Sequence, residues 1–167
     1  MIVRIQVDRD VAPAVGRETL RRLGEIVTRA GRRLGLTSPV LRSLGLRIVG
    51  DAVMIELHRR HLGHARPTDV LSFPAGDDAP FGAGDVAIDW DQVRRQALDA
   101  SPAGWCDEAA QLVVHAMAHL VGHDHGRRPD ARRMFRAERR AARSAAVAVP
   151  VRPYAPAASS AGLGGAP

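Results

Sequence analysis

The chemistry open to this chain is indicated first by its histidines, which fall into two groups. The larger group lies in the segment H-A-M-A-H-L-V-G-H-D-H, residues 115–125. Residues four apart on a helix share one face, with Cβ atoms about 6 Å apart, so His115 and His119 can hold one ion. Gly122 can end this helix in a left-handed conformation, and the chain can then turn back to bring His125 to the same ion. The spacing predicts one zinc ion per chain on His115, His119 and His125, with a fourth position left for water.

Two alternatives to this assignment stay open. The first is that these histidines bind no metal, because a single histidine on an apolar helix is more often a packed core or surface residue. Against it, the segment combines a pair of histidines four apart, a glycine that can end the helix and a further histidine beyond it. His123 is an alternative third ligand, although it lies only one residue past the glycine.

The same spacing occurs in the metzincin proteases, H-E-x-x-H-x-x-G-x-x-H. The position of their glutamate, which acts as general base, is Ala116 in this chain. Hydrolysis of a phosphodiester depends less on such a base, because a zinc ion lowers the pKa of its bound water to about 7. The missing glutamate therefore favours a phosphodiester over a peptide as the substrate.

The smaller histidine group consists of His58, His61 and His64, which lie three residues apart and would share one side of a helix. They can form a second metal site or contact RNA. The more common state of such residues is an exposed polar position, which is the interpretation we favour.

Arginines are concentrated between residues 127 and 143, at positions 127, 128, 132, 133, 136, 139, 140 and 143. They are too closely spaced for one narrow helix face, so they favour a solvated helix, but they are also the best candidate surface for an RNA backbone. The formal net charge of +6 is compatible with an acidic partner. All 24 basic residues are arginine, so part of this excess reflects composition alone.

The elements that must position these residues follow from the hydrophobic patterning. Strands are predicted at residues 2–7, 44–49, 69–73 and 85–88. Helices are predicted from Pro13 to Gly35, from a cap at Asp51, and over residues 89–100, 107–121 and 130–146, with a T-S-P loop after Gly35. Asp107 and Glu108 are expected at the positive N-terminal end of the histidine-bearing helix. Residues 147–167 are rich in Pro, Ala, Gly and Ser and are predicted to be a disordered tail.

Composition narrows the class of protein. No apolar run approaches the roughly 20 residues that a membrane-spanning helix needs, so we expect a water-soluble protein without a membrane partner. The start, MIVRIQVDRD, lacks the apolar centre of a secretory signal, which predicts a cytoplasmic location. Cys106 is the single cysteine and cannot form an internal disulfide, which fits a reducing compartment.

Several motifs, in the right order, resemble the YbeY family. The family's signature H-G-x-L-H-L-x-G-Y-D-H is matched by six residues of the larger histidine segment, which are His115, His119, Leu120, Gly122, Asp124 and His125. The family's P-T-D/N-V-L-S-F-P stands intact at residues 67–74, its G-D-V strand at 84–86, and its M-x-x-x-E as Met134 and Glu138. The similarity covers about residues 44–142.

The resemblance implies a single-domain α+β fold, zinc-dependent cleavage of single-stranded RNA, and a role in small-subunit ribosomal RNA maturation and ribosome quality control. Together with the predicted elements, it gives a domain over residues 1–146. We expect a small mixed sheet of about four strands, packed with about five helices, and a metal site at the end of a central helix. The partners implied are ribosomal RNA and the small ribosomal subunit.

This chain departs from the family in two places. The family's L-N-x-x-Y-R segment is here residues 57–62, in which asparagine, tyrosine and arginine are replaced by His58, His61 and Leu62. In the signature, glycine, leucine and tyrosine are replaced by Ala116, Ala118 and His123. Neither set of changes touches the three predicted ligands, but the family's arginine, which acts in the active-site cleft, is lost at Leu62.

The lost positive charge has three candidate substitutes, Arg59, Arg60 and Arg66, because a guanidinium on a long stem can act from a neighbouring position. They can equally lie on a solvated helix face. Asp124 and Asp85 are candidates to orient ligands or water, although a carboxylate beside a helix end is often only a cap. Two rival functions stay open: an RNA- or ribosome-binding protein that keeps the metal with weak or no cleavage, and a metallopeptidase.

Overall fold

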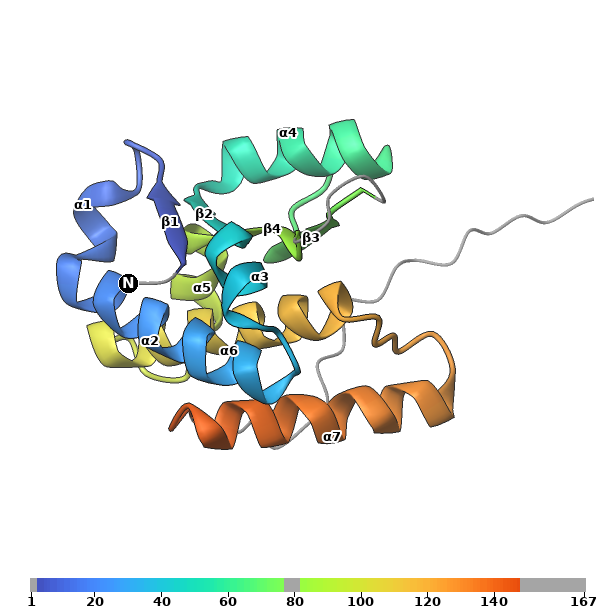
Figure 1. Cartoon of the computed structure of the whole chain (residues 1–167). Helices are drawn as coiled ribbons and strands as arrows, with labels where there is room; N and C mark the ends of the chain where they lie inside the picture. Colours follow the sequence, from blue (N-terminus) through green and yellow to red (C-terminus); the bar gives the residue numbers. More distant parts are fainter. Residues whose placement is uncertain (1–2, 77–81, 148–167) are drawn as a thin grey trace, which may run out of the picture.

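The computed structural model describes residues 3–76 and 82–147, which form one mixed sheet covered by helices (Figure 1). The strands are β1 (Arg4–Val7), β2 (Gly45–Val49), β3 (Val70–Pro74) and β4 (Gly84–Asp89). Their order in the sheet is β1-β2-β4-β3, with β1, β2 and β4 parallel and β3 antiparallel to β4. The predicted α+β class with a small mixed sheet is confirmed.

Seven helices lie within the described residues. They are α1 (Ala12–Val15), α2 (Arg17–Arg33), α3 (Ser38–Ser43), α4 (Asp51–Leu62), α5 (Trp90–Gln96), α6 (Pro102–Leu120) and α7 (Arg128–Ser144). In Figure 1, α4 lies above the sheet, while α2, α6 and α7 lie below it. None of the helices in the described part of the chain is both long and apolar enough to span a membrane.

Alternation along the strands divides the buried side chains between the two faces of the sheet. On the lower face, Leu46 and Ile48 of β2 and Val86 and Ile88 of β4 join the main core with α2 and α6. On the upper face, a smaller cluster forms beneath α4, with buried Val49, Met54, Leu71 and Ala87. The central strands are therefore buried on their lower face and only in part on their upper face, where Arg47 and Asp85 remain partly exposed. Helix α6 lies against β3 and β4 as the central helix of the main core.

The predicted strands are all present, whereas some helix predictions were wrong in detail. The single helix predicted from Pro13 to Gly35 is divided at Gly16 into α1 and α2. Helix α6 begins at Pro102, not at residue 107, because Ser101 caps it by accepting a hydrogen bond from the N–H of Gly104. Asp107 therefore lies inside the helix, where its Oδ1 accepts a hydrogen bond from Arg22 at 2.7 Å. Asp51 is in the first turn of α4, after the extended Gly50, so it is not the cap residue.

Two further differences concern segments predicted to be irregular. The T-S-P segment is not a loop but the start of α3, with Pro39 in the first turn, where its missing N–H costs no helical hydrogen bond. Val147, at the start of the predicted tail, is buried and donates its N–H to the carbonyl of Ala142. The rest of the predicted tail, residues 148–167, lies outside the described residues.

Candidate metal centre

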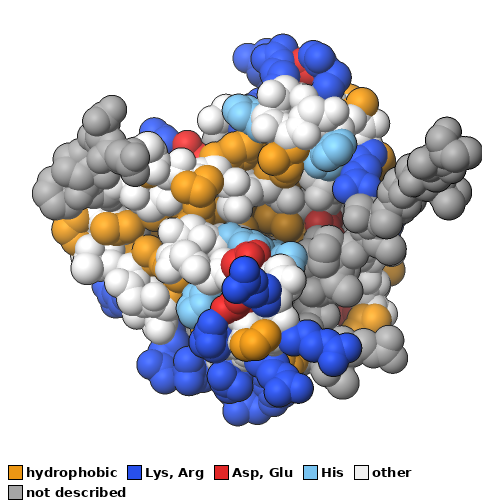
Figure 2. All heavy atoms as spheres, turned by 90° about the vertical axis from the view of Figure 1, so that its right-hand side faces the viewer, with side chains coloured by type: hydrophobic (Ala, Val, Ile, Leu, Met, Phe, Trp, Pro, Cys, Tyr) orange, Lys and Arg blue, Asp and Glu red, His pale blue; other side chains and the backbone are white. Residues whose placement is uncertain are grey.

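Three histidine side chains meet at the C-terminal end of α6. Nitrogen atoms of His115, His119 and His125 all lie within 4.8 Å of one another. The centroids of the His115 and His119 rings are 4.8 Å apart, and the His125 ring lies 5.5 Å from the first and 4.9 Å from the second. Space-filling shows histidines gathered at the middle of one face of the molecule (Figure 2). The sequence prediction that these three side chains converge is confirmed.

The chain reverses after α6 because Gly122 adopts a positive φ of 86°. The N–H of Gly122 donates to the carbonyl of His119 at 2.9 Å, and the N–H of His123 donates to that of Ala118 at 3.0 Å. These bonds satisfy carbonyls that a helix end leaves without partners. The turn brings His125 beside His115 and His119, as the position of Gly122 in the sequence predicted.

His123, the alternative third ligand, has a different place. Its side chain is not part of the group of converging nitrogens among the described residues. Its backbone carbonyl accepts a hydrogen bond from Nδ1 of His119 at 3.0 Å. Because a carbonyl can only accept, Nδ1 of His119 carries the proton, and Nε2 has a free lone pair for a metal.

His115 is oriented by a residue from another helix. Its Nδ1 donates to Oε1 of Glu138 in α7 at 2.7 Å, and both side chains are buried. A carboxylate that accepts from the far nitrogen of a metal-binding histidine fixes the ring and its tautomer, and makes the near nitrogen more basic. His115 and His119 therefore both present Nε2 to the space between the rings.

From the sequence, Glu138 was predicted only as part of the family's M-x-x-x-E, and its contact with His115 was not predicted. A signal was nevertheless present. Glu138 lies on the apolar side of an otherwise arginine-rich helix, together with the buried Met134 and Ala141. A carboxylate on the buried face of an amphipathic helix requires a buried partner, and a histidine at a predicted metal site is such a partner.

The electrostatics of the centre suit a cation bound by neutral imidazoles. Burial lowers the pKa of His119, and the neighbouring His115 and His125 lower it further, so the ring is held in its neutral form. Asp124 is exposed, and its Oδ1 accepts a hydrogen bond from the N–H of His125 at 2.7 Å. This hydrogen bond lowers the pKa of Asp124 and keeps a negative charge beside the rings. Three imidazoles with two oriented Nε2 atoms fit zinc, which takes histidine nitrogen at about 2.0–2.1 Å.

The smaller histidine group does not converge in this way. His58 is buried, and its Nδ1 lies 2.8 Å from the carbonyl oxygen of Arg66, so the prediction that it is an exposed polar residue was wrong. The ring of His61 packs edge-on against Phe73, with centroids 4.7 Å apart, and the ring of His64 lies 5.7 Å from that of His58. The candidate metal-binding groups found in the described residues do not include these three histidines.

The candidate arginines on α4 point to a local carboxylate. Arg59 donates two hydrogen bonds to Glu56, at 2.9 and 2.8 Å, and Arg60 also donates to Glu56. Arg66 is exposed, and its backbone carbonyl contacts His58. Within the described part of the chain, none of the three shows an ion pair or hydrogen bond with the converging histidines. Leu62, at the position of the family's arginine, is 57% exposed.

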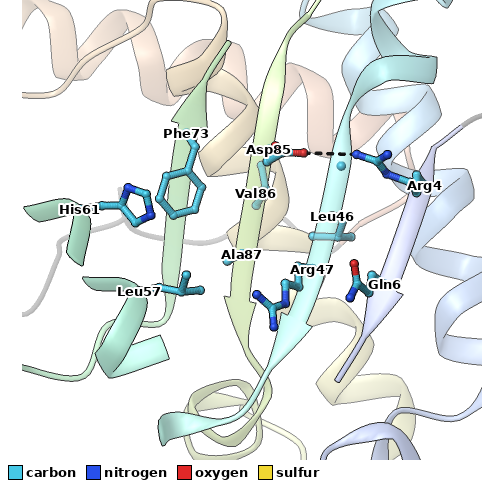
Figure 3. A pocket seen from close by; sticks show the side chains of 11 residues that line it. Arg4, Gln6, Leu46, Arg47, Leu57, His61, Phe73, Asp85, Val86 and Ala87 are labelled. Atoms are coloured by element: carbon cyan, nitrogen blue, oxygen red, sulfur yellow. Dashed lines mark ion pairs between the residues drawn. The ribbon is translucent and has the colours of Figure 1, made fainter. Parts of the chain in front are cut away.

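Asp85 lies apart from the three converging histidines, in a groove of about 400 Å³ that runs over the upper face of the sheet below α4 (Figure 3). It forms a long ion pair of 3.8 Å with Arg4, and both side chains are well exposed. His61 and Phe73 line the opposite side of the same groove. The structure therefore places Asp124 beside the histidines and Asp85 elsewhere.

The family model and the similar proteins that match this chain carry the same name. The sequence model of the family described as Endoribonuclease YbeY matches residues 8–146. A protein named endoribonuclease YbeY from a Chelativorans species is 36% identical over 151 residues, which cover 84% of this chain and 91% of that protein. Another of that name, from Roseiflexus castenholzii, is 35% identical over 137 residues, covering 77% of this chain and 82% of the relative.

A solution structure of a protein from Thermotoga maritima is similar with a TM-score of 0.49 and 19% sequence identity, over 86% of this chain and 88% of that one. The family match extends over most of the described residues, from Asp8 near the end of β1 to Ala146 just after α7, and includes all three converging histidines. On the family match and the two long alignments, this chain belongs to the YbeY endoribonuclease family.

Proposed function

We propose that this protein is a zinc-dependent endoribonuclease that cleaves single-stranded RNA, with His115, His119 and His125 as the ligands of one zinc ion. The observation that carries the proposal is the convergence of the three rings, with Nδ1 of His115 and His119 already engaged by Glu138 and by the carbonyl of His123. Membership of the family supports the RNA of the small ribosomal subunit as its substrate. The protein would act in the cytoplasm, in maturation of that RNA and in quality control of ribosomes. The names of the relatives support RNA as the substrate.

The chain's own residues supply position and charge. Glu138 and the carbonyl of His123 hold two imidazoles with Nε2 turned inwards, and Asp124 fixes the backbone of the third ligand, His125. When bound, a zinc ion would lower the pKa of a coordinated water and stabilise negative charge on a phosphoryl oxygen. Asp124 is the carboxylate placed to orient that water or to hold a proton.

One observation favours a second candidate function, an RNA- or ribosome-binding protein that cleaves weakly or not at all. Leu62, at the position of the family's arginine, carries no charge. Its predicted substitutes on α4, Arg59 and Arg60, are both paired with Glu56. Loss of a charge-assisted contact to the phosphate would slow cleavage without disturbing the metal centre. A metallopeptidase is less favoured, because Ala116 is buried on α6 and offers no general base.

The test is cleavage of a labelled single-stranded RNA by the zinc-loaded protein, alongside an RNA duplex and casein. We expect products from the single strand only, and loss of cleavage after removal of the metal with a chelator and recovery after zinc is returned. Zinc-loaded protein that binds the RNA but leaves it intact would favour the binding protein. Cleavage of casein would favour the peptidase.

A further inference from the structure

Helix α7 carries a continuous arginine face. We define it by seven residues, which are Arg128, Arg132, Arg133, Arg136, Arg139, Arg140 and Arg143. At 3.6 residues per turn, their positions fall within an arc of about 140°. The opposite side of the helix is buried, with Met134, Ala137, Glu138, Ala141 and Ala142. The arginines therefore share one broad face, which points away from the core.

Most of this charge is not neutralised within the described residues. Helix α7 has two carboxylates, of which Asp130 pairs with Arg133 and Glu138 is buried against His115. The guanidinium of Arg139 lies over the ring of Phe135. In the part of the chain that the structure describes, the salt bridges leave six of the seven guanidiniums of this face without a carboxylate, all except that of Arg133. Arg132, Arg136 and Arg140 are exposed members of this set.

Other helices of this protein show what an ordinary solvated arginine face looks like. On α2, Arg21 pairs with Glu18 and Glu25, which lie three and four residues away. On α4, Glu56 pairs with Arg59 and Arg60. Such pairs stabilise exposed helices, whereas like charges four residues apart, as in the series Arg128, Arg132, Arg136 and Arg140, destabilise them. The arginine-rich composition of the chain alone does not explain why α7 has no such pairing at these positions.

The arginine face begins beside the metal centre. Arg128 follows His125 by three residues, so their Cα atoms are at most about 11 Å apart. With a rise of 1.5 Å per residue, the face extends for about 22 Å, with steps of about 6 Å between residues four apart. Figure 2 shows arginines gathered below the central histidines, at the height at which α7 lies in Figure 1. An RNA strand at the histidines is thus within reach of this row.

We propose that the arginine face of α7 binds the phosphate backbone of RNA next to the strand held at the metal centre, without regard to base sequence. The inference rests on the proposed function, since it assigns the metal centre an RNA strand. Guanidiniums bind phosphate oxygens with two parallel N–H donors, and phosphate contacts fix the position of RNA while carrying no base information. Each phosphate that is neutralised releases counterions, so this binding weakens steeply with salt.

The test measures binding alone, with the zinc-loaded protein and a 2′-O-methyl RNA that cannot be cleaved through its 2′-hydroxyl. The variant combines Arg132→Gln, Arg136→Gln and Arg140→Gln. Its matched control loses the same charge from other elements through Arg9→Gln, Arg17→Gln and Arg42→Gln, all at exposed positions. A third variant replaces the same three α7 arginines by lysine, which retains the charge. Affinity is measured by fluorescence anisotropy over a series of salt concentrations and with two unrelated RNA sequences.

We expect the glutamine variant of α7 to bind both RNAs at least about tenfold more weakly near 0.1 M salt, and to lower the slope of log affinity against log salt by about 2, since each phosphate contact contributes about 0.7. The lysine variant should keep most of the slope, and the control should keep most of the affinity. If the triple variant does not fold, Arg136→Gln alone should lower the slope by about 0.7.

An unchanged slope in the glutamine variants of α7, or an equal loss of affinity in the control, would overturn the proposal. Binding is scored separately from cleavage, so a wild-type protein that binds in this way but does not cleave would contradict the proposed enzyme and not this surface.

Discussion

The two histidine groups of this protein are both closely spaced in the sequence, but the side chains of only one group converge. In the larger group, one nitrogen from each of three rings lies within 4.8 Å of the other two, and the other nitrogens of His115 and His119 are held by Glu138 and by a backbone carbonyl. In the smaller group, His58 turns inwards to the carbonyl of Arg66 and His61 packs against Phe73. Close spacing in sequence is therefore not sufficient. A third histidine from beyond a helix end, and partners that orient the rings, distinguish the larger group.

The largest difference between the groups should appear when one histidine is removed from each. His119→Ala should release most of the zinc and abolish cleavage of single-stranded RNA, because two remaining imidazoles hold the ion weakly. His61→Ala should leave the zinc content unchanged, because its ring contacts only the groove below α4. Metal content by mass spectrometry, with circular dichroism to confirm folding, measures both. Full zinc occupancy in the folded His119→Ala protein would refute the assignment of the ligands.

The smaller histidine group lies beside Leu62, the position at which the family has an arginine. Restoring that arginine tests whether this region can contribute to cleavage as the larger group is expected to do. Leu62 is exposed, so an arginine fits there without repacking. If no other residue meets the phosphate charge, Leu62→Arg should accelerate single-turnover cleavage on the order of a hundredfold, the effect of about 3 kcal/mol in the transition state. Zinc content should not change.

Variants of Arg59, Arg60 and Arg66 to alanine provide the control for this experiment. They should have little effect on cleavage if Glu56 keeps the first two occupied and Arg66 does not reach the phosphate. Loss of cleavage in one of them, together with no gain from Leu62→Arg, would identify that arginine as the substitute.

Substitution of Glu138, the partner of His115, tests whether the orientation of the His115 ring contributes to zinc affinity. Glu138→Gln keeps the size of the side chain and removes the carboxylate that accepts from Nδ1. We expect zinc affinity to fall roughly ten- to hundredfold, the usual effect of losing such a partner. The matched control is Glu25→Gln, because Glu25 is exposed on α2. Equal zinc affinities in competition with a chelator would show that Glu138 is only a packing residue.

A cluster of carboxylates shows again that proximity alone does not make a metal site. Oxygens of Asp51, Asp89 and Asp91 lie within 4.8 Å of one another, but Asp51 is already paired with Arg95. Burial, and then the neighbouring Asp51, raise the pKa of Asp89 to about 7. A raised carboxyl pKa means that the contribution of Asp89 to stability is fully present below its unfolded pKa of about 3.9 and is lost as the pH rises through 7.

Asp89→Asn removes this titration while keeping the oxygen that accepts from the N–H groups of Asp91 and Gln92. The asparagine should therefore match the wild type near pH 4 and be the more stable protein at pH 8. Urea unfolding at several pH values measures the difference. Parallel stability curves for the two proteins across this range would contradict the raised pKa.

The sequence predicted the parts of the site that depend on local geometry. His115 and His119 follow from helix periodicity, and His125 follows from the left-handed turn at Gly122. The buried contact between His115 and Glu138 joins two helices, so it depends on packing that periodicity does not describe. The inward turn of His58 was missed for the same reason, because its partner is a backbone carbonyl eight residues away. Helix α3 was not predicted, because Pro39 was interpreted as part of a loop, although proline is also common in the first turn of a helix.

The central claim is that three of the seven histidines, and no others, hold one zinc ion. Zinc-edge X-ray absorption of the purified protein tests it most directly, because the spectrum counts imidazole ligands and gives their distances. We expect one zinc per chain, bound by three imidazole nitrogens at about 2.0–2.1 Å and one further oxygen. A spectrum with four imidazoles, with carboxylate in place of imidazole, or with zinc in clear excess of one per chain would contradict this account.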